Sequence, residues 1–178
     1  ALDPVQTIPT LDDDGFLLAD SHAIIIYLAR RYGNGTELYS EDFVQQAKIH
    51  SALFFESSIL FARLRFCTDN LIVFRKGAIP EENLQRAADG LRLFEAMLQS
   101  DYVVGDRLTI ADLSCVSSVS TLHRLLPVTA ADYPKTFAWV ERLAQLPYYE
   151  EVNVRGLKAA GEMIKMLTAR NDAEPSKV

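Results

Sequence analysis

The pattern of hydrophobic and polar positions divides the chain into a short N-terminal region with strands and a long helical remainder. Two apolar runs, Thr7–Leu11 and Phe16–Ala19, flank the turn sequence Asp-Asp-Asp-Gly, and this arrangement predicts a β-hairpin. Asp20-Ser21 then precedes an apolar stretch that ends in Arg30-Arg31. A capping residue, an apolar run and basic residues in that order predict a helix that stops before Gly33.

Glycines and polar residues at positions 33–40 predict a linker, and the pattern after it is helical. Glu41–Lys76 predicts one long helix, or two helices that meet near Cys67–Asn70. Pro80 is favourable in a first turn and predicts a helix to about Ser100.

Thr109 and Asp112 predict a capping box, which Leu108 and Leu113 bracket as a hydrophobic staple. The helix that follows is mostly apolar, so we expect it to be buried in the helical region. Two more helices are predicted over residues 134–146 and 148–168, the second broken or recapped at its glycines, Gly156 and Gly161. The polar residues 171–178 predict a frayed tail.

Composition narrows the class of protein. With 178 residues, 49% of them hydrophobic, the chain can bury a substantial core. A net charge of −6 with scattered basic residues argues against a nucleic-acid surface, and no apolar run reaches the length of a membrane span. Cys67 and Cys115 are too few for a disulfide framework, and the histidines lack metal-ligand spacing. We therefore expect a cytoplasmic protein without a metal site.

Candidate chemistry begins at the hairpin and the helix after it. A cis Ile8–Pro9 bond would leave the backbone groups of Ile8 free to pair with a ligand, although base rates favour the trans form. At the helix start, free N–H groups and the Ser21 hydroxyl suit a carboxylate, while Asp20 suits an ammonium. Together they could hold the zwitterionic end of an amino acid, or they could simply cap the helix. His22 could help this site or face solvent.

A second candidate is a stripe at i, i+3, i+4 and i+7 of the long helical segment, formed by Ile59, Ala62, Arg63 and Phe66. One cation in an apolar stripe indicates the wall of a pocket for an apolar substrate. The alternative is a core stripe in which Arg63 extends to water or pairs with Glu56.

Four blocks of sequence resemble the cytosolic glutathione transferases, and most closely the insect delta and epsilon classes. They are the segment from Asp3-Pro4 through Thr7-Ile8-Pro9 to Asp20-Ser21-His22-Ala23-Ile24, the segment Phe55–Phe66, the segment Leu108–Asp112 and the segment Gln145–Glu151. The last three blocks resemble the epsilon class in particular. The blocks occur in the family's order and cover the chain almost end to end.

The resemblance implies an α+β fold. Residues 1–33 would be the second part of a thioredoxin-like domain, 34–40 a linker, 41–170 an all-helical bundle and 171–178 a flexible tail. The serine that activates the glutathione thiol would lie upstream of Ala1, so no catalytic residue is expected in this chain. The resemblance assigns glutathione binding to Gln6, Thr7, Ile8, Pro9, Asp20, Ser21, His22 and Arg63. It assigns the hydrophobic pocket to Ile59, Ala62, Arg63 and Phe66.

The resemblance also implies an activity. A homodimer would hold glutathione as co-substrate and conjugate its thiolate to hydrophobic electrophiles, as in detoxification. Gln6 stands where the family pattern has a histidine, and it can donate through its amide but cannot titrate. This departure and the absent serine favour an alternative, a non-catalytic module of the same fold used for ligand carriage or protein assembly.

Overall fold

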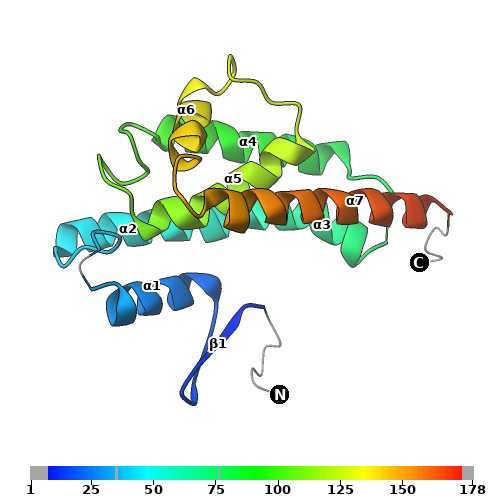
Figure 1. Cartoon of the computed structure of the whole chain (residues 1–178). Helices are drawn as coiled ribbons and strands as arrows, with labels where there is room; N and C mark the ends of the chain where they lie inside the picture. The colour runs from blue at the N-terminus through cyan, green and yellow to red at the C-terminus, as the bar shows by residue number, and fades with distance from the viewer. Residues whose placement is uncertain (1–7, 35, 76, 174–178) are drawn as a thin grey trace.

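The computed structural model describes residues 8–34, 36–75 and 77–173, and it consists of a small N-terminal unit beside a bundle of helices (Figure 1). The N-terminal unit contains β1 (Thr10–Asp13), β2 (Phe16–Ala19) and α1 (Ser21–Tyr32). The strands form an antiparallel pair with Thr10 opposite Ala19. Asp14 and Gly15 turn the chain with positive φ angles of 51° and 89°, as the tight hairpin turns require. The predicted hairpin and helix are therefore confirmed.

The bundle begins with a continuous helical rod made of α2 (Phe43–Phe55), the π-helical turn η1 (Glu56–Phe61) and α3 (Ala62–Ile72). The predicted junction near Cys67–Asn70 is wrong, since the rod changes its winding at η1 and α3 passes through those residues unbroken. The remaining helices are α4 (Glu81–Met97), α5 (Ile110–Leu125), α6 (Pro134–Leu143), the π-helical η2 (Glu150–Val154) and α7 (Arg155–Ala173).

The last helix departs from its prediction in two ways. It runs without a break through Gly156 and Gly161, where an added Cβ would meet no atom within 4 Å, and it continues to Ala173. Its end is fixed to the rod, because the buried Asn171 amide donates to the Leu71 carbonyl at 3.0 Å across 100 residues of sequence. Residues 171–173 thus belong to the helix, and the rest of the predicted tail lies outside the described residues.

The predicted capping box is present and sits at the centre of the bundle. The fully buried Asp112 carboxylate accepts hydrogen bonds from the Thr109 N–H at 2.9 Å, the Val103 N–H at 2.8 Å and the Trp139 indole at 2.9 Å. Trp139 in turn packs edge-on against Phe94 of α4, with ring centroids 4.9 Å apart. One carboxylate therefore joins the start of α5, the preceding connector and α6.

A second carboxylate joins α4 to α6. Glu95 accepts hydrogen bonds from the backbone N–H groups of Lys135 at 3.0 Å and Thr136 at 2.8 Å, and from the Thr136 hydroxyl at 2.7 Å. Partial burial acts to raise the pKa of Glu95, but these hydrogen bonds outweigh it, so the pKa lies below its usual value of 4.5. The N–H groups at the start of α6 are thus satisfied by another helix.

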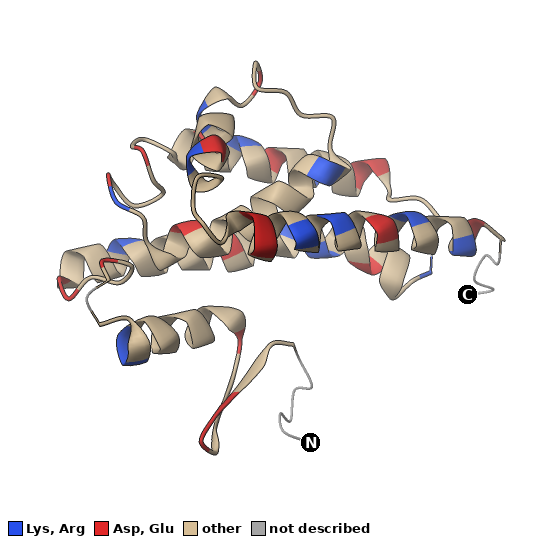
Figure 2. Cartoon of the chain, in the orientation of Figure 1, with Lys and Arg blue, Asp and Glu red and all other residues tan. Residues whose placement is uncertain are grey.

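Two hydrophobic clusters make up the core. The larger one joins α3, α4, α5 and α6, and the smaller one, around Ile49, Leu53 and Ile110, receives Ile25, Ile26 and Ala29 from α1. Within residues 8–34 only Ile24 is buried. Figure 2 shows Lys and Arg interspersed with Asp and Glu along the elements. None of the described helices is long and apolar enough to cross a membrane.

Candidate functional site

The hairpin register brings the two sequence candidates of the N-terminal unit to one end of the hairpin. Because Thr10 lies opposite Ala19, the preceding Ile8-Pro9 and the following Asp20-Ser21 are neighbours across the two strands. The Ile8–Pro9 peptide bond is cis, whereas base rates alone favoured the trans isomer, so that expectation is wrong. The Ile8 residue is 97% exposed, which leaves it accessible to a ligand.

The first turn of α1 shows how Asp20 is used. Its Oδ1 atom accepts hydrogen bonds from the N–H groups of His22 at 2.9 Å and Ala23 at 3.0 Å, which is the capping role held open as the alternative. Within the described residues, neither Asp20 Oδ2 nor the exposed Ser21 hydroxyl has a hydrogen bond from the protein. Capping therefore uses one carboxylate oxygen and leaves the other oxygen and the hydroxyl for a ligand.

Asp20 also adopts a backbone conformation that its neighbours must hold in place. Its φ angle is 75°, in the left-handed region that residues other than glycine rarely occupy, although aspartate tolerates it better than most. Residues held in this region often lie at ligand sites, where the surrounding structure compensates for the strain. Here the two hydrogen bonds to the Asp20 side chain and the pairing of β2 fix the residue from both sides.

His22 links this helix start to the interior of the bundle. Its Nε2 atom lies 2.5 Å from Oε2 of Glu56, whose side chain is buried, and the Ser118 hydroxyl on α5 donates to the other oxygen of Glu56. The hydrogen bond with Glu56 raises the pKa of His22 above its usual 6.5, against the opposing effect of burial, and Asp20 at 3.6 Å adds to the increase. His22 is therefore turned toward the bundle, and the solvent-facing alternative is wrong.

Glu56 and Ser118 also belong to the site, but the sequence patterns did not connect either of them with His22. Glu56 was considered only as a partner for Arg63. The signal that could have identified it is its place between the core positions Leu53 and Leu60, because a carboxylate at a buried helix position requires hydrogen-bonding partners. Their identity depends on contacts 34 and 62 residues away in sequence.

Arg63 lies on the side of the rod that faces α4. Its guanidinium donates to the Arg86 carbonyl at 2.9 Å, and its Cδ atom would be 3.1 Å from a Cβ added to Gly90. The π-helical turn η1 lies between Glu56 and Arg63 and winds more residues per turn than an α-helix, so a spacing of seven does not keep them on one face. Arg63 is thus turned toward α4, and its predicted contact with glutathione stays a prediction.

The other members of the predicted pocket wall are not core residues. Ile59 and Ala62 are half-buried and Phe66 is 54% exposed. Cys67, the next residue, is fully buried, and burial raises the pKa of its thiol to about 11, which makes it unreactive at neutral pH. Gln6 and Thr7, also predicted for the glutathione site, lie outside the described residues.

Comparison with known proteins identifies relatives of this chain. The family models for the glutathione S-transferase C-terminal and N-terminal domains match residues 45–147 and 1–36. Glutathione S-transferase 1 of Manduca sexta is 38% identical over 156 residues, which cover 87% of this chain and 72% of the relative.

The solved structures that resemble this one include two insect glutathione transferases. The epsilon-class glutathione S-transferase of the housefly Musca domestica has a TM-score of 0.89 and 36% identity, covering 93% of this chain and 77% of the other. A glutathione transferase homologue from Drosophila mojavensis, solved with bound glutathione, has a TM-score of 0.88 and 39% identity, covering 93% and 76%.

Proposed function

Because the chain belongs to the glutathione S-transferase family, with relatives in the insect epsilon and delta group, we propose that it binds glutathione at the end of the hairpin and the start of α1. The observation that carries this proposal is the register that makes Ile8-Pro9 and Asp20-Ser21 neighbours. The proposed reaction is attack of the glutathione thiolate on hydrophobic electrophiles.

Each part of the proposed site matches one group at the zwitterionic end of an amino acid. The Ser21 hydroxyl and the positive end of the α1 dipole would receive a carboxylate, because a helix N-terminus favours negative charge. Asp20 Oδ2 would receive the ammonium, and the exposed peptide groups of Ile8 would pair with the ligand backbone as a strand does. His22 would hold the first turn in place through Glu56 rather than touch the ligand.

Chemistry at the thiol requires a donor that stabilises the thiolate and lowers its pKa toward neutrality. We assign none of the residues of this chain to that role. What these residues would contribute is binding, which brings the thiol and an electrophile together, a large part of the rate gain in such reactions. Ile59, Ala62 and Phe66 are proposed as the apolar surface for the electrophile.

A homodimer is proposed as the assembly, and we place the protein in the cytoplasm. Support for a dimer comes from large apolar side chains on the surface of α2, where Phe43 is 85% exposed and Phe54 is 71% exposed. Analytical ultracentrifugation tests this assignment, since a species with the mass of one chain at all concentrations would contradict it. The comparisons give no support to the non-catalytic alternative that Gln6 favoured, since the relatives reported above are transferases by name.

Retention on immobilised glutathione tests the binding site. The Ser21→Ala variant should elute earlier than the wild-type chain, because the ligand carboxylate loses a donor, whereas Ser51→Ala on the surface of α2 is the matched control. Equal retention of the wild-type chain and both variants would contradict the proposed site.

Turnover of a generic aromatic electrophile with glutathione tests the activity. Binding without turnover in the complete protein would argue for the ligand-carrying alternative.

A further inference from the structure

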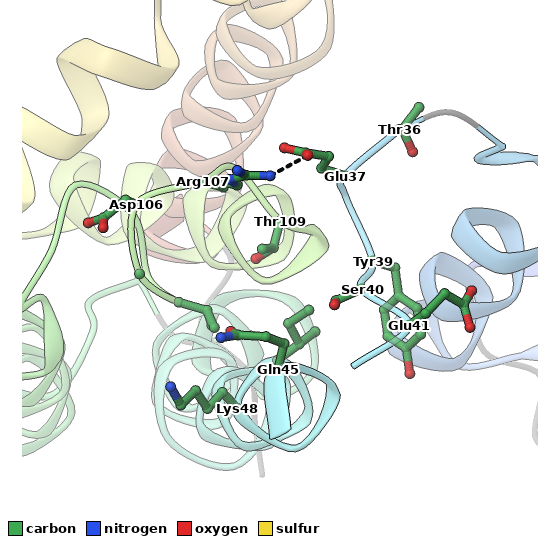
Figure 3. Close-up of a pocket in the computed structure, with 13 residues that line it drawn as sticks. Thr36, Glu37, Tyr39, Ser40, Glu41, Gln45, Lys48, Asp106, Arg107 and Thr109 are labelled. Atoms are coloured by element: carbon green, nitrogen blue, oxygen red, sulfur yellow. Dashed lines mark hydrogen bonds and ion pairs between the residues drawn. The ribbon is translucent and has the colours of Figure 1, made fainter. Parts of the chain in front are cut away.

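A cavity of about 570 Å³ lies where the linker meets the start of α2 and the connector between α4 and α5 (Figure 3). It is separate from the proposed glutathione site. The linker leaves the C-terminal end of α1, and the 12 residues of that helix span about 18 Å from Asp20. Ile49 and Val104, both buried, give the cavity an apolar floor.

Contacts between distant segments form the walls. The Ile110 N–H donates to the Leu38 carbonyl at 2.9 Å, and the Tyr39 hydroxyl lies 2.8 Å from Nε2 of His50. Arg107 forms an ion pair with Glu37 that joins the connector to the linker, as the dashed line in Figure 3 marks. These interactions fix the linker against the bundle, so the cavity is formed before any ligand arrives.

Both signs of charge remain unpaired around this cavity. Within the part of the chain that the structure describes, the side chains of Lys48, Gln45, Glu41 and Asp106 form no ion pair or hydrogen bond, although the Gln45 backbone N–H donates to the Asp42 carboxylate. Lys48 and Gln45 stand three residues apart on α2 and share a face of that helix. Arg107 and Glu37 neutralise each other, so the available groups are one ammonium with an amide beside it and two carboxylates.

We propose that this cavity binds a short peptide with free termini. The peptide carboxylate would pair with Lys48 and the Gln45 amide, its ammonium would pair with Asp106 or Glu41, and an apolar side chain would rest on Ile49 and Val104. The volume lies within the range of about 300–1,000 Å³ that is usual for small-molecule sites. Pairing at both ends selects a zwitterion, because a ligand of one sign would leave one set of charges unmatched.

Titration with the tripeptide Gly-Leu-Gly, followed by the amide resonance of Gly105, tests this site. We expect saturable binding that weakens about tenfold in Lys48→Met and in Asp106→Asn, since each variant removes one charged contact. Lys158→Met on the exposed surface of α7 and Ser21→Ala at the proposed glutathione site should bind the tripeptide like the wild-type chain.

The same tripeptide with an acetylated N-terminus and an amidated C-terminus separates charge recognition from apolar contact. We expect it to bind at least tenfold more weakly. Equal binding of the capped and free peptides, no saturable change at Gly105, or binding that Lys48→Met leaves unchanged would each overturn the proposal. A loss of binding in Ser21→Ala would also overturn it, because the peptide would then occupy the glutathione site.

Discussion

The N-terminal unit and the helical bundle keep their shapes by different means. The bundle has a core in which Leu60, Phe94 and Trp139 are almost fully buried, and the buried Asp112 carboxylate joins several of its elements. The unit of residues 8–34 buries only Ile24 and depends on the docking of α1 and on the contact of His22 with Glu56. The proposed ligand site therefore lies on the part of the molecule with the fewer buried apolar side chains, where we expect local opening to be easiest.

Removal of the Asp112 carboxylate should have the largest effect and should destabilise the bundle itself. Asp112→Ala leaves the buried N–H groups of Trp139 and Thr109 and the half-buried N–H of Val103 without an acceptor. Each unsatisfied buried donor costs about 1–3 kcal/mol, so we expect a loss of about 3–5 kcal/mol in the free energy of unfolding. Urea denaturation followed by circular dichroism measures this loss.

Asp112→Asn is the matched variant, since its amide oxygen keeps part of the acceptor set while the charge is lost. It should retain more stability than Asp112→Ala. If the two variants unfold at the same urea concentration as the wild-type chain, the carboxylate is not the structural centre of the bundle.

Shortening Ile24 should affect the N-terminal unit and leave the bundle nearly unchanged. Ile24→Ala removes the one buried side chain of residues 8–34, with an expected cost of about 2–3 kcal/mol for the docking of α1. Amide hydrogen exchange should become faster in α1 while α5 remains protected. Leu28→Ala, at a position that is 37% exposed, should change exchange less. Equal acceleration in α1 and α5 would show that the two regions unfold as one.

The contact between the two regions should depend on pH. Because Glu56 raises the pKa of His22 above 6.5, the stabilisation is complete below pH 6.5 and is lost as the pH rises through the raised pKa. Glu56→Gln should remove this dependence, return the pKa of His22 toward 6.5 and cost about 1–2 kcal/mol. Nuclear magnetic resonance titration of His22 measures the shift, with His50 as the internal reference. An unchanged His22 titration in Glu56→Gln would contradict the assigned contact.

The smallest effect is expected at Glu95, within the bundle. Hydrogen bonds to Lys135 and Thr136 lower its pKa, so its contribution is present above pH 4.5 and is lost as the pH falls through the lowered value. Glu95→Gln should cost about 0.5–1 kcal/mol at pH 7, discounted for its partial exposure, and less in acid. Thermal unfolding at pH 7 and pH 3 compares the two. The same loss at both pH values would contradict a role for the charge.

Local signals predicted most of the fold, and contacts across the sequence account for the rest. The hairpin, α1 and the capping box at Thr109 and Asp112 were predictable because each depends on residues a few positions apart. The contact of His22 with Glu56 spans 34 residues and depends on how α1 docks, which periodicity does not contain. The direction of Arg63 toward α4 was not predictable for a related reason, since helical spacing assumes one winding throughout and η1 changes it.

The π-helical turn η1 bears on where the rod can lose a residue. Deleting one residue after Glu56 within η1 would leave a regular helix, and the two ends of the rod would keep nearly their present orientation, because the wide turn holds one residue more than an α-helical turn. The rod could then still keep Glu56 toward His22 and Ser118, and Arg63 toward α4. The same deletion within α2 or α3 would turn one end of the rod by about 100° relative to the other, so we expect single deletions to be tolerated at η1 and avoided in those two helices.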